Sequence, residues 1–240
     1  MYWNYQVSLI FSGLFVLTNS YYWKKRPRYW KEYLLFGTFY LIMELFQTTQ
    51  WLYGNVYDRS LSIGIEKCDS VNRNFTLVAH TLIWLQPIMF SYIGYHTNSN
   101  KKIFGYFHLM NWIVLLYSLI VLYIGLDYHD YYHIDNSIYG LSTCTNKGQT
   151  GHLVWKFKPY TIDYFPNYFM YLFLCVLSFV MYDKLETKII GVGWFVSLVV
   201  TKIVLQPSVL ELASSWCLLS IVGNFIIYGY LHLEQIMILC

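Results

Sequence analysis

At 240 residues the chain has the length of one domain, yet 57% of its residues are hydrophobic and only 12% are charged. Soluble domains carry about 25% charged residues, so this composition excludes an ordinary soluble globule. The net charge of +3 is small, and no basic run interleaved with aromatic residues points to a nucleic-acid partner.

Seven apolar segments follow one another, each close to the ~20 residues that a helix needs to cross a bilayer core. They cover residues 5–22, 33–53, 77–95, 104–126, 164–182, 188–206 and 209–231. Lipid cannot hydrogen-bond to an open backbone, so each segment is predicted to be a helix. We expect an all-α, polytopic membrane protein in which residues 1–240 form a single domain, a seven-transmembrane-helix bundle.

The last two segments are separated only by Gln206, Pro207 and Ser208. Proline cannot continue the hydrogen-bond ladder of a helix, so the simplest interpretation is a tight turn at Pro207. The alternative is one long helix with a kink.

The distribution of Lys and Arg predicts the orientation in the membrane. The first loop contains Lys24, Lys25, Arg26, Arg28 and Lys31, and the first, third and fifth loops together hold nine basic and three acidic residues. The long second and fourth loops hold six basic and seven acidic residues. The odd-numbered loops and the C-terminus are therefore expected in the cytosol, and the N-terminus outside.

Cysteine placement agrees with this orientation. Cys68 lies in the second loop and Cys144 in the fourth, both on the side assigned to the outside. We expect a Cys68–Cys144 disulfide if the membrane belongs to the secretory pathway, and two free thiols are the alternative. The membrane itself is expected to be one of the secretory pathway, the plasma membrane or a viral membrane.

Polar residues inside apolar helices are informative because they are costly to bury unless paired or hydrated. Glu44, Gln47, Thr48 and Trp51 share one helical face, at positions i, i+3, i+4 and i+7. At about 1.5 Å per residue, Gln50, His80, Lys202 and Glu211 lie roughly three to five residues below the outer surface, and Glu44, Gln86 and Ser215 about eight to ten. This pattern predicts a cavity that opens outward. Its expected ligand-binding residues are Glu44, Gln47, Trp51, His80, Gln86, Lys202, Glu211 and Ser215.

Each of these residues also has a structural interpretation, because Gln and Ser often join helices within a bundle. Lys202 and Glu211 flank the Pro207 turn at matching depth, so an ion pair is expected between them. Glu44 lies deepest with no cation at its depth, which favours a functional role for it.

The fourth loop packs His129, His133 and three aspartates into nine residues, from Asp127 to Asp135. Transition metals favour such ligands, but the spacing matches no closed zinc motif, and a tyrosine-rich interfacial segment is the simpler interpretation. Residues 148–155 are expected to form a structured loop that caps the cavity. No Ser-His-Asp grouping, P-loop or dinucleotide fingerprint is present, so no metal, cofactor or catalytic residue is assigned.

Several short motifs resemble an uncharacterised seven-transmembrane-helix family associated with large DNA viruses. The motifs are Met43-Glu44…Gln47…Trp51, Cys68-Asp69…Asn72…Thr76…Leu85-Gln86-Pro87, Cys144…Gly151-His152-Leu153…Trp155 and Glu211…Ser214-Ser215-Trp216-Cys217. The resemblance implies a viral or protist-related source and supplies no mechanism.

The expected function is binding of a small molecule or ion in the outward-opening cavity of a multi-pass membrane protein, as in a receptor or transporter. The partners expected are the lipid bilayer and that ligand. An integral-membrane hydrolase that holds a metal with His80, His152, Asp69 or the fourth-loop histidines is the first alternative. A structural or assembly protein of a viral or internal membrane is the second.

Overall fold

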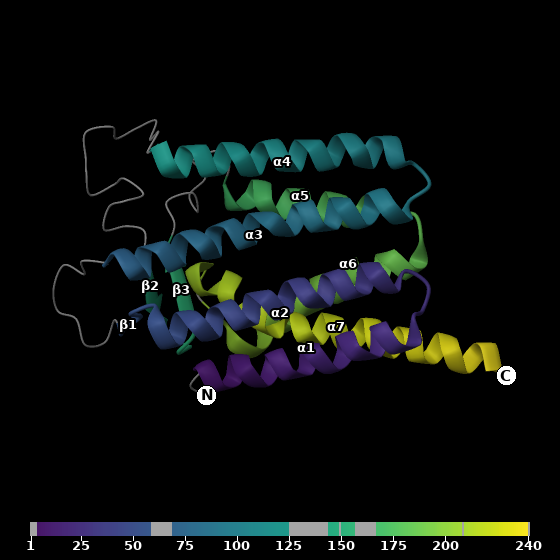
Figure 1. The fold of residues 1–240 in the computed structure, drawn as a ribbon, viewed down its shortest axis with the longest axis horizontal. Coiled ribbons are helices and arrows are strands. Elements are labelled where there is room, and N and C mark those ends of the chain that lie inside the picture. Colours follow the sequence, from purple (N-terminus) through teal and green to yellow (C-terminus); the bar gives the residue numbers. More distant parts are fainter. Residues whose placement is uncertain are drawn as a thin grey trace.

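The structure is a computed structural model that describes residues 4–58, 69–124, 144–148, 150–156, 167–207 and 209–239. Most of these residues belong to seven helices that form an elongated bundle (Figure 1). The helices are α1 (Tyr5–Lys25), α2 (Trp30–Tyr53), α3 (Ser70–Thr97), α4 (Lys101–Ile124), α5 (Tyr168–Met181), α6 (Leu185–Leu205) and α7 (Val209–Leu239). Each coincides with one predicted segment, so the all-α class and the helix count are confirmed.

Four of the helices are long and apolar enough to cross a membrane: those at Ser70–Thr97, Lys101–Ile120, Leu185–Leu205 and Glu211–Leu233. The described part of α5 is apolar but shorter. The chain is therefore compatible with a membrane protein. Seven crossings and their orientation remain predictions.

Short polar side chains start several of the helices. Asn4 accepts hydrogen bonds from the backbone at the start of α1, Asp69 from Asn72 N–H in α3, and Asn167 from Met170 N–H in α5. Such N-caps satisfy N–H groups that have no partner within the helix. Polar residues in the chain thus set where each of these helices begins.

The predicted turn at Pro207 is confirmed. Helix α6 ends at Leu205, Gln206 adopts the left-handed conformation with φ 45°, and α7 begins at Val209. The single kinked helix is therefore wrong, because the chain reverses direction here and α6 packs along α7.

A small three-stranded sheet, which the sequence did not predict, lies at one end of the bundle (Figure 1). Strand β1 (Tyr57–Asp58) pairs in parallel with β2 (Cys144–Lys147), and β2 pairs antiparallel with β3 (Leu153–Lys156). The connections α1–α2, α3–α4 and α5–α6 lie at the opposite end (Figure 1). The segment expected as a structured loop over residues 148–155 is only partly a loop, because it holds the turn of the β2–β3 hairpin and then Leu153–Trp155 of strand β3. Its role as a cap over a cavity stays a prediction.

The cysteines are only partly described. Cys144 is buried at the start of β2, whereas Cys68 lies outside the described residues, so the disulfide stays a prediction. Cys175 and Cys217 are free thiols inside the bundle.

The bundle has an apolar exterior and many polar side chains inside. Leu17, Val180 and Ile203 are each about two-thirds or more exposed, and large apolar side chains on every helix behave similarly. Glu44, Gln47 and other polar side chains are fully buried. Exposed apolar surface on this scale in a soluble monomer would drive association, whereas in a membrane it faces lipid.

Helices α6 and α7 cross at two glycines. A Cβ atom added to Gly193 would lie 2.8 Å from the carbonyl oxygen of Gly223, and a Cβ on Gly223 would lie 2.8 Å from that of Gly193. The two backbones are therefore in direct contact, a device that helices use where lipid supplies no hydrophobic driving force.

Candidate functional site

The β2–β3 hairpin is attached to the helices chiefly through Thr145. Its hydroxyl accepts from Gln50 Nε2 at 2.8 Å and lies 2.7 Å from Thr76 Oγ1. Its backbone N–H donates to Asn72 Oδ1 and its carbonyl accepts from Asn72 Nδ2, both at 2.8 Å. All four residues are fully buried. Side chains of α2 and α3 thus satisfy a strand that would otherwise bury unpaired backbone groups.

Glu211, a predicted ligand-binding residue, belongs to this attachment. Its Oε1 accepts from both the backbone N–H and the hydroxyl of Thr150, at 3.0 Å each. Gly148 lies directly against the carboxylate and leaves no room there for a Cβ atom. The hairpin turn therefore covers Glu211. Its Oε1 atom, which was predicted to contact a ligand, is bonded to Thr150 instead.

His152 joins the hairpin to α7. Its Nδ1 accepts from Leu153 N–H at 2.9 Å and lies 3.0 Å from Ser214 Oγ, which also donates to the Leu153 carbonyl. Burial lowers the pKa of this imidazole to about 3, partly offset by the backbone contact with Leu153. The side chain is therefore neutral at physiological pH and acts as an acceptor at Nδ1.

Gln86 lies at the centre of a second buried network. Its Oε1 accepts from Tyr171 OH at 2.7 Å and from Tyr40 OH at 3.1 Å, and its Nε2 lies 3.9 Å from Cys217 Sγ. Four helices, α2, α3, α5 and α7, meet through this one amide. The amide oxygen has both its acceptor positions used by the protein, which fits the role of a helix-joining residue.

His80 faces α4. Its Nε2 lies 2.9 Å from Ser118 Oγ, and its ring packs near Trp84. Trp51, the last residue of the predicted face on α2, is only half-buried at the edge of the core.

The expected ion pair between Lys202 and Glu211 is wrong. Lys202 is exposed on α6, and its Nζ donates to the carbonyl of Pro207 at 3.2 Å, whereas Glu211 turns to the hairpin. The two helices present these side chains to different surroundings. Lys202 instead stabilises the turn between α6 and α7.

Glu44 is the exception among the predicted residues. It is fully buried, and neither of its carboxylate oxygens makes a hydrogen bond of standard geometry with the residues the structure describes, although the Ser8 side chain lies near enough to interact with the carboxyl. The group lies on α2 close to Ser8 of α1 and Cys217 of α7. An unpartnered charge in such surroundings is strongly unfavourable, so Glu44 must hold a proton or a cation.

A second free oxygen lies one turn further along the same face. Gln47 Nε2 donates to the carbonyl of Ser214 at 3.3 Å, but its Oε1 has no described partner. The hydroxyl of Ser215 is likewise buried without one. The predicted inward orientation of the Glu44 face is confirmed by the burial of Glu44, Gln47 and Thr48.

The metal-dependent hydrolase finds no support in the described part of the chain. His80 and His152 contact serine hydroxyls, and Asp69 caps α3 and accepts from Asn55. No three His, Cys, Asp or Glu side chains gather there in a way that would hold a metal ion. His129 and His133 lie outside the described residues.

The site and fold thus define a helical bundle with membrane-length apolar helices and a polar interior. The chain belongs to a family of unknown function, DUF5765, whose model matches residues 6–237. It is 58% identical over 235 residues to the uncharacterized protein R287 of Acanthamoeba polyphaga mimivirus, covering 98% of this chain and 97% of that protein. The predicted link to an uncharacterised family of large DNA viruses is confirmed. No solved structure matches the chain.

Proposed function

We propose that the chain is an integral membrane protein whose single bundle crosses the bilayer seven times. The apolar exterior and the four membrane-length helices support this. The N-terminus lies outside and the C-terminus in the cytosol, because the odd-numbered loops collect at one end of the bundle and carry nine basic and three acidic residues.

This orientation predicts that only the N-terminus is accessible from outside the cell. A tag before Met1 should be reached by antibody on intact cells, whereas a tag after Cys240 should require permeabilised cells. The opposite pattern would reverse the orientation.

Within this bundle, Glu44 is proposed to bind a small monovalent cation, either a proton or Na⁺, as in a transporter. The observation that carries the proposal is the fully buried carboxyl, which makes no hydrogen bond of standard geometry with a described residue and has only the Ser8 side chain nearby as a polar neighbour on α1. A carboxyl that only joined helices would have a partner to join, as Gln86 and Glu211 have. Ionisable groups inside membrane bundles commonly mark ion or proton pathways.

The chemistry of the surroundings favours an ion over a larger ligand. The free atoms next to one another on α2 are oxygens, those of the Glu44 carboxyl and Gln47 Oε1, which suit hard cations. Three of the other predicted site residues, His80, Gln86 and Glu211, already bond to protein groups, whereas the Ser215 hydroxyl has no described partner. We therefore propose an ion site at Glu44 in place of the larger small-molecule cavity that was expected.

The test compares wild-type protein with Glu44→Gln, which keeps the shape and removes the charge. In detergent, NaCl should raise the melting temperature of the wild type relative to choline chloride of equal ionic strength. A fall in pH, which protonates the carboxyl, should raise it as well. A ligand at 100 times its Kd adds about 2.7 kcal/mol. Glu44→Gln should fold but lose this response.

Glu32→Gln is the matched control, because it makes the same change in the first turn of the same helix. It should respond as the wild type does. A Glu44→Gln variant that keeps the full wild-type response to Na⁺ and pH would refute the ion site.

A further inference from the structure

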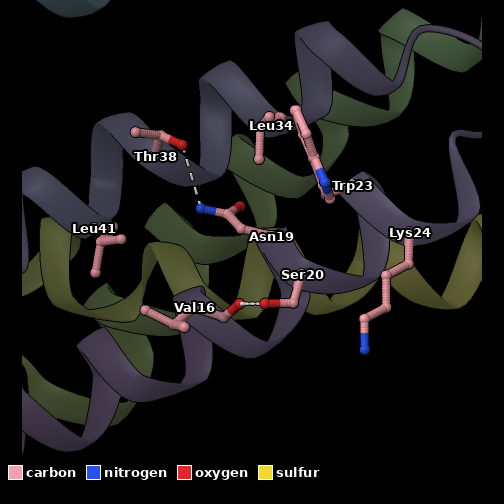
Figure 2. A pocket seen from close by; sticks show the side chains of 8 residues that line it. All are labelled: Val16, Asn19, Ser20, Trp23, Lys24, Leu34, Thr38 and Leu41. Carbon is pink, nitrogen blue, oxygen red and sulfur yellow. Dashed lines mark hydrogen bonds between the residues drawn. The ribbon is translucent and has the colours of Figure 1, made fainter.

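A groove of about 330 Å³ runs along the outside of the bundle between α1 and α2. Figure 2 shows Val16 and Leu41 at one end, Asn19 and Thr38 in the middle, and Trp23 and Lys24 at the other end. From Val16 to Lys24 the groove follows α1 for about 12 Å, at 1.5 Å per residue. Glu44 is not among its lining residues, and the groove belongs to the surface that the proposed topology turns toward lipid.

The polar side chains along the groove are directed to the protein. Asn19 Nδ2 donates to Thr38 Oγ1 at 3.3 Å, and Ser20 Oγ donates to the Val16 carbonyl at 2.8 Å (Figure 2). The Oδ1 atom of Asn19 lies against Gly37, where only the absence of a Cβ atom gives it room. The Asn19 amide nitrogen and the Ser20 hydroxyl are therefore bonded within the protein, whereas Asn19 Oδ1 has no described hydrogen-bond partner. The apolar side chains of Val16, Leu34 and Leu41 give the groove a wall that suits a hydrocarbon chain.

The end of the groove at the α1–α2 loop is strongly basic. Lys24 forms no ion pair or hydrogen bond with any described residue. Arg26 stacks over Trp23 and Trp30 at 5.6 and 5.5 Å, and Lys31 lies 5.8 Å from Trp30. Arg28 is already paired with Glu186 at 2.9 Å. Tryptophan and basic side chains at a helix end are typical of the headgroup level of a membrane.

We propose that this groove binds one anionic phospholipid, with an acyl chain between α1 and α2 and the phosphate at Lys24. The apolar wall matches the acyl chain, and Lys24, which pairs with no described residue, matches the negative headgroup. Each basic residue near an anionic lipid surface contributes about 1 kcal/mol, which is about fivefold in affinity. The site requires the proposed membrane location but is independent of the ion at Glu44.

Native mass spectrometry of the detergent-purified protein tests this with phosphatidylglycerol and phosphatidylcholine of identical acyl chains. The wild type should retain one phosphatidylglycerol in preference to phosphatidylcholine. Lys24→Gln should weaken phosphatidylglycerol binding about fivefold and leave phosphatidylcholine binding unchanged. Lys188→Gln, at an exposed position on α6, is the matched control and should behave as the wild type.

Val16→Trp fills the groove from an exposed position, so the bundle should still fold with an unchanged melting temperature. It should reduce binding of both lipids. Equal retention of the two lipids by the wild type, or phosphatidylglycerol binding that survives both Lys24→Gln and Val16→Trp, would overturn the proposal. A dimer that Val16→Trp dissociates in lipid-free detergent would assign the groove to a second copy of the chain instead.

Discussion

Acidification from neutral pH to about pH 4 should loosen the β2–β3 hairpin, and His152→Asn should remove this sensitivity. Burial holds the pKa of His152 near 3 in the folded protein, whereas an unfolded histidine has a pKa of about 6.5. The stability that the neutral imidazole contributes is therefore complete above pH 6.5. It is lost as the pH falls toward 3, by about 1.4 kcal/mol per pH unit.

Burial is the main reason that the protonated form is unfavourable, and the Leu153 backbone offsets only part of this effect. Nδ1 accepts the Leu153 N–H, so a proton on Nδ1 would face another donor and break the contact. Asparagine places its side-chain oxygen close to the position of Nδ1 and cannot be protonated in this range. Hydrogen exchange of the Thr145 and Leu153 amides, corrected for intrinsic rates, reports on the hairpin directly.

The control for this experiment is His96→Asn, at an exposed position on α3. In this variant, the hairpin amides should lose protection from hydrogen exchange with falling pH, as they do in the wild type. If His152→Asn loses protection just as steeply, another group governs the acid sensitivity and the role given to His152 is wrong.

Gly193→Leu should destabilise the protein by about 3 kcal/mol or more, the upper part of the range for overpacking. The first atom of any side chain at this position meets the backbone of Gly223 at 2.8–3.2 Å, and backbone cannot move aside as a flexible side chain can. Helices α6 and α7 must therefore separate. The measurement is the free energy of unfolding in mixed detergent micelles.

Gly229→Leu provides the comparison on α7, because no atom lies within 4 Å of a Cβ added there. It should be neutral or slightly stabilising, since leucine favours a helix by up to about 1 kcal/mol over glycine. Equal losses in the two variants would show that the α6–α7 crossing does not depend on the Gly193–Gly223 contact.

The helices could be predicted because apolar segments long enough to cross a bilayer have few alternatives to a helix. The sheet was not, because strands of two and four residues carry too little pattern, and β1 pairs with β2 across two intervening helices. Its signal was present in another form. Asn72, Thr76 and Ser214 are polar residues within apolar helices, and all three bond to the hairpin.

The position of a residue along its helix could be predicted from the sequence. The side of the helix from which its side chain projects was harder to predict. Spacing on α2 placed Glu44 and Gln47 inside correctly, because they share one face with Thr48 and Trp51. Lys202 has no polar neighbours on its face of α6. Counting residues from the helix end therefore predicted its position along the helix but not which way its side chain points. The ion pair was inferred from the positions of Lys202 and Glu211 on either side of the Pro207 turn and from their matching depth, whereas Lys202 bonds to the Pro207 carbonyl.

The most direct test of the ion site is an infrared difference spectrum of the membrane-reconstituted protein, recorded on changing the pH or adding Na⁺. We predict a carbonyl band of a protonated carboxyl that weakens when the pH rises or Na⁺ is added. The band should be absent from Glu44→Gln and retained in Glu32→Gln. A Glu44 band that stays constant across both changes would show a permanently neutral packing residue, and would contradict the proposed function.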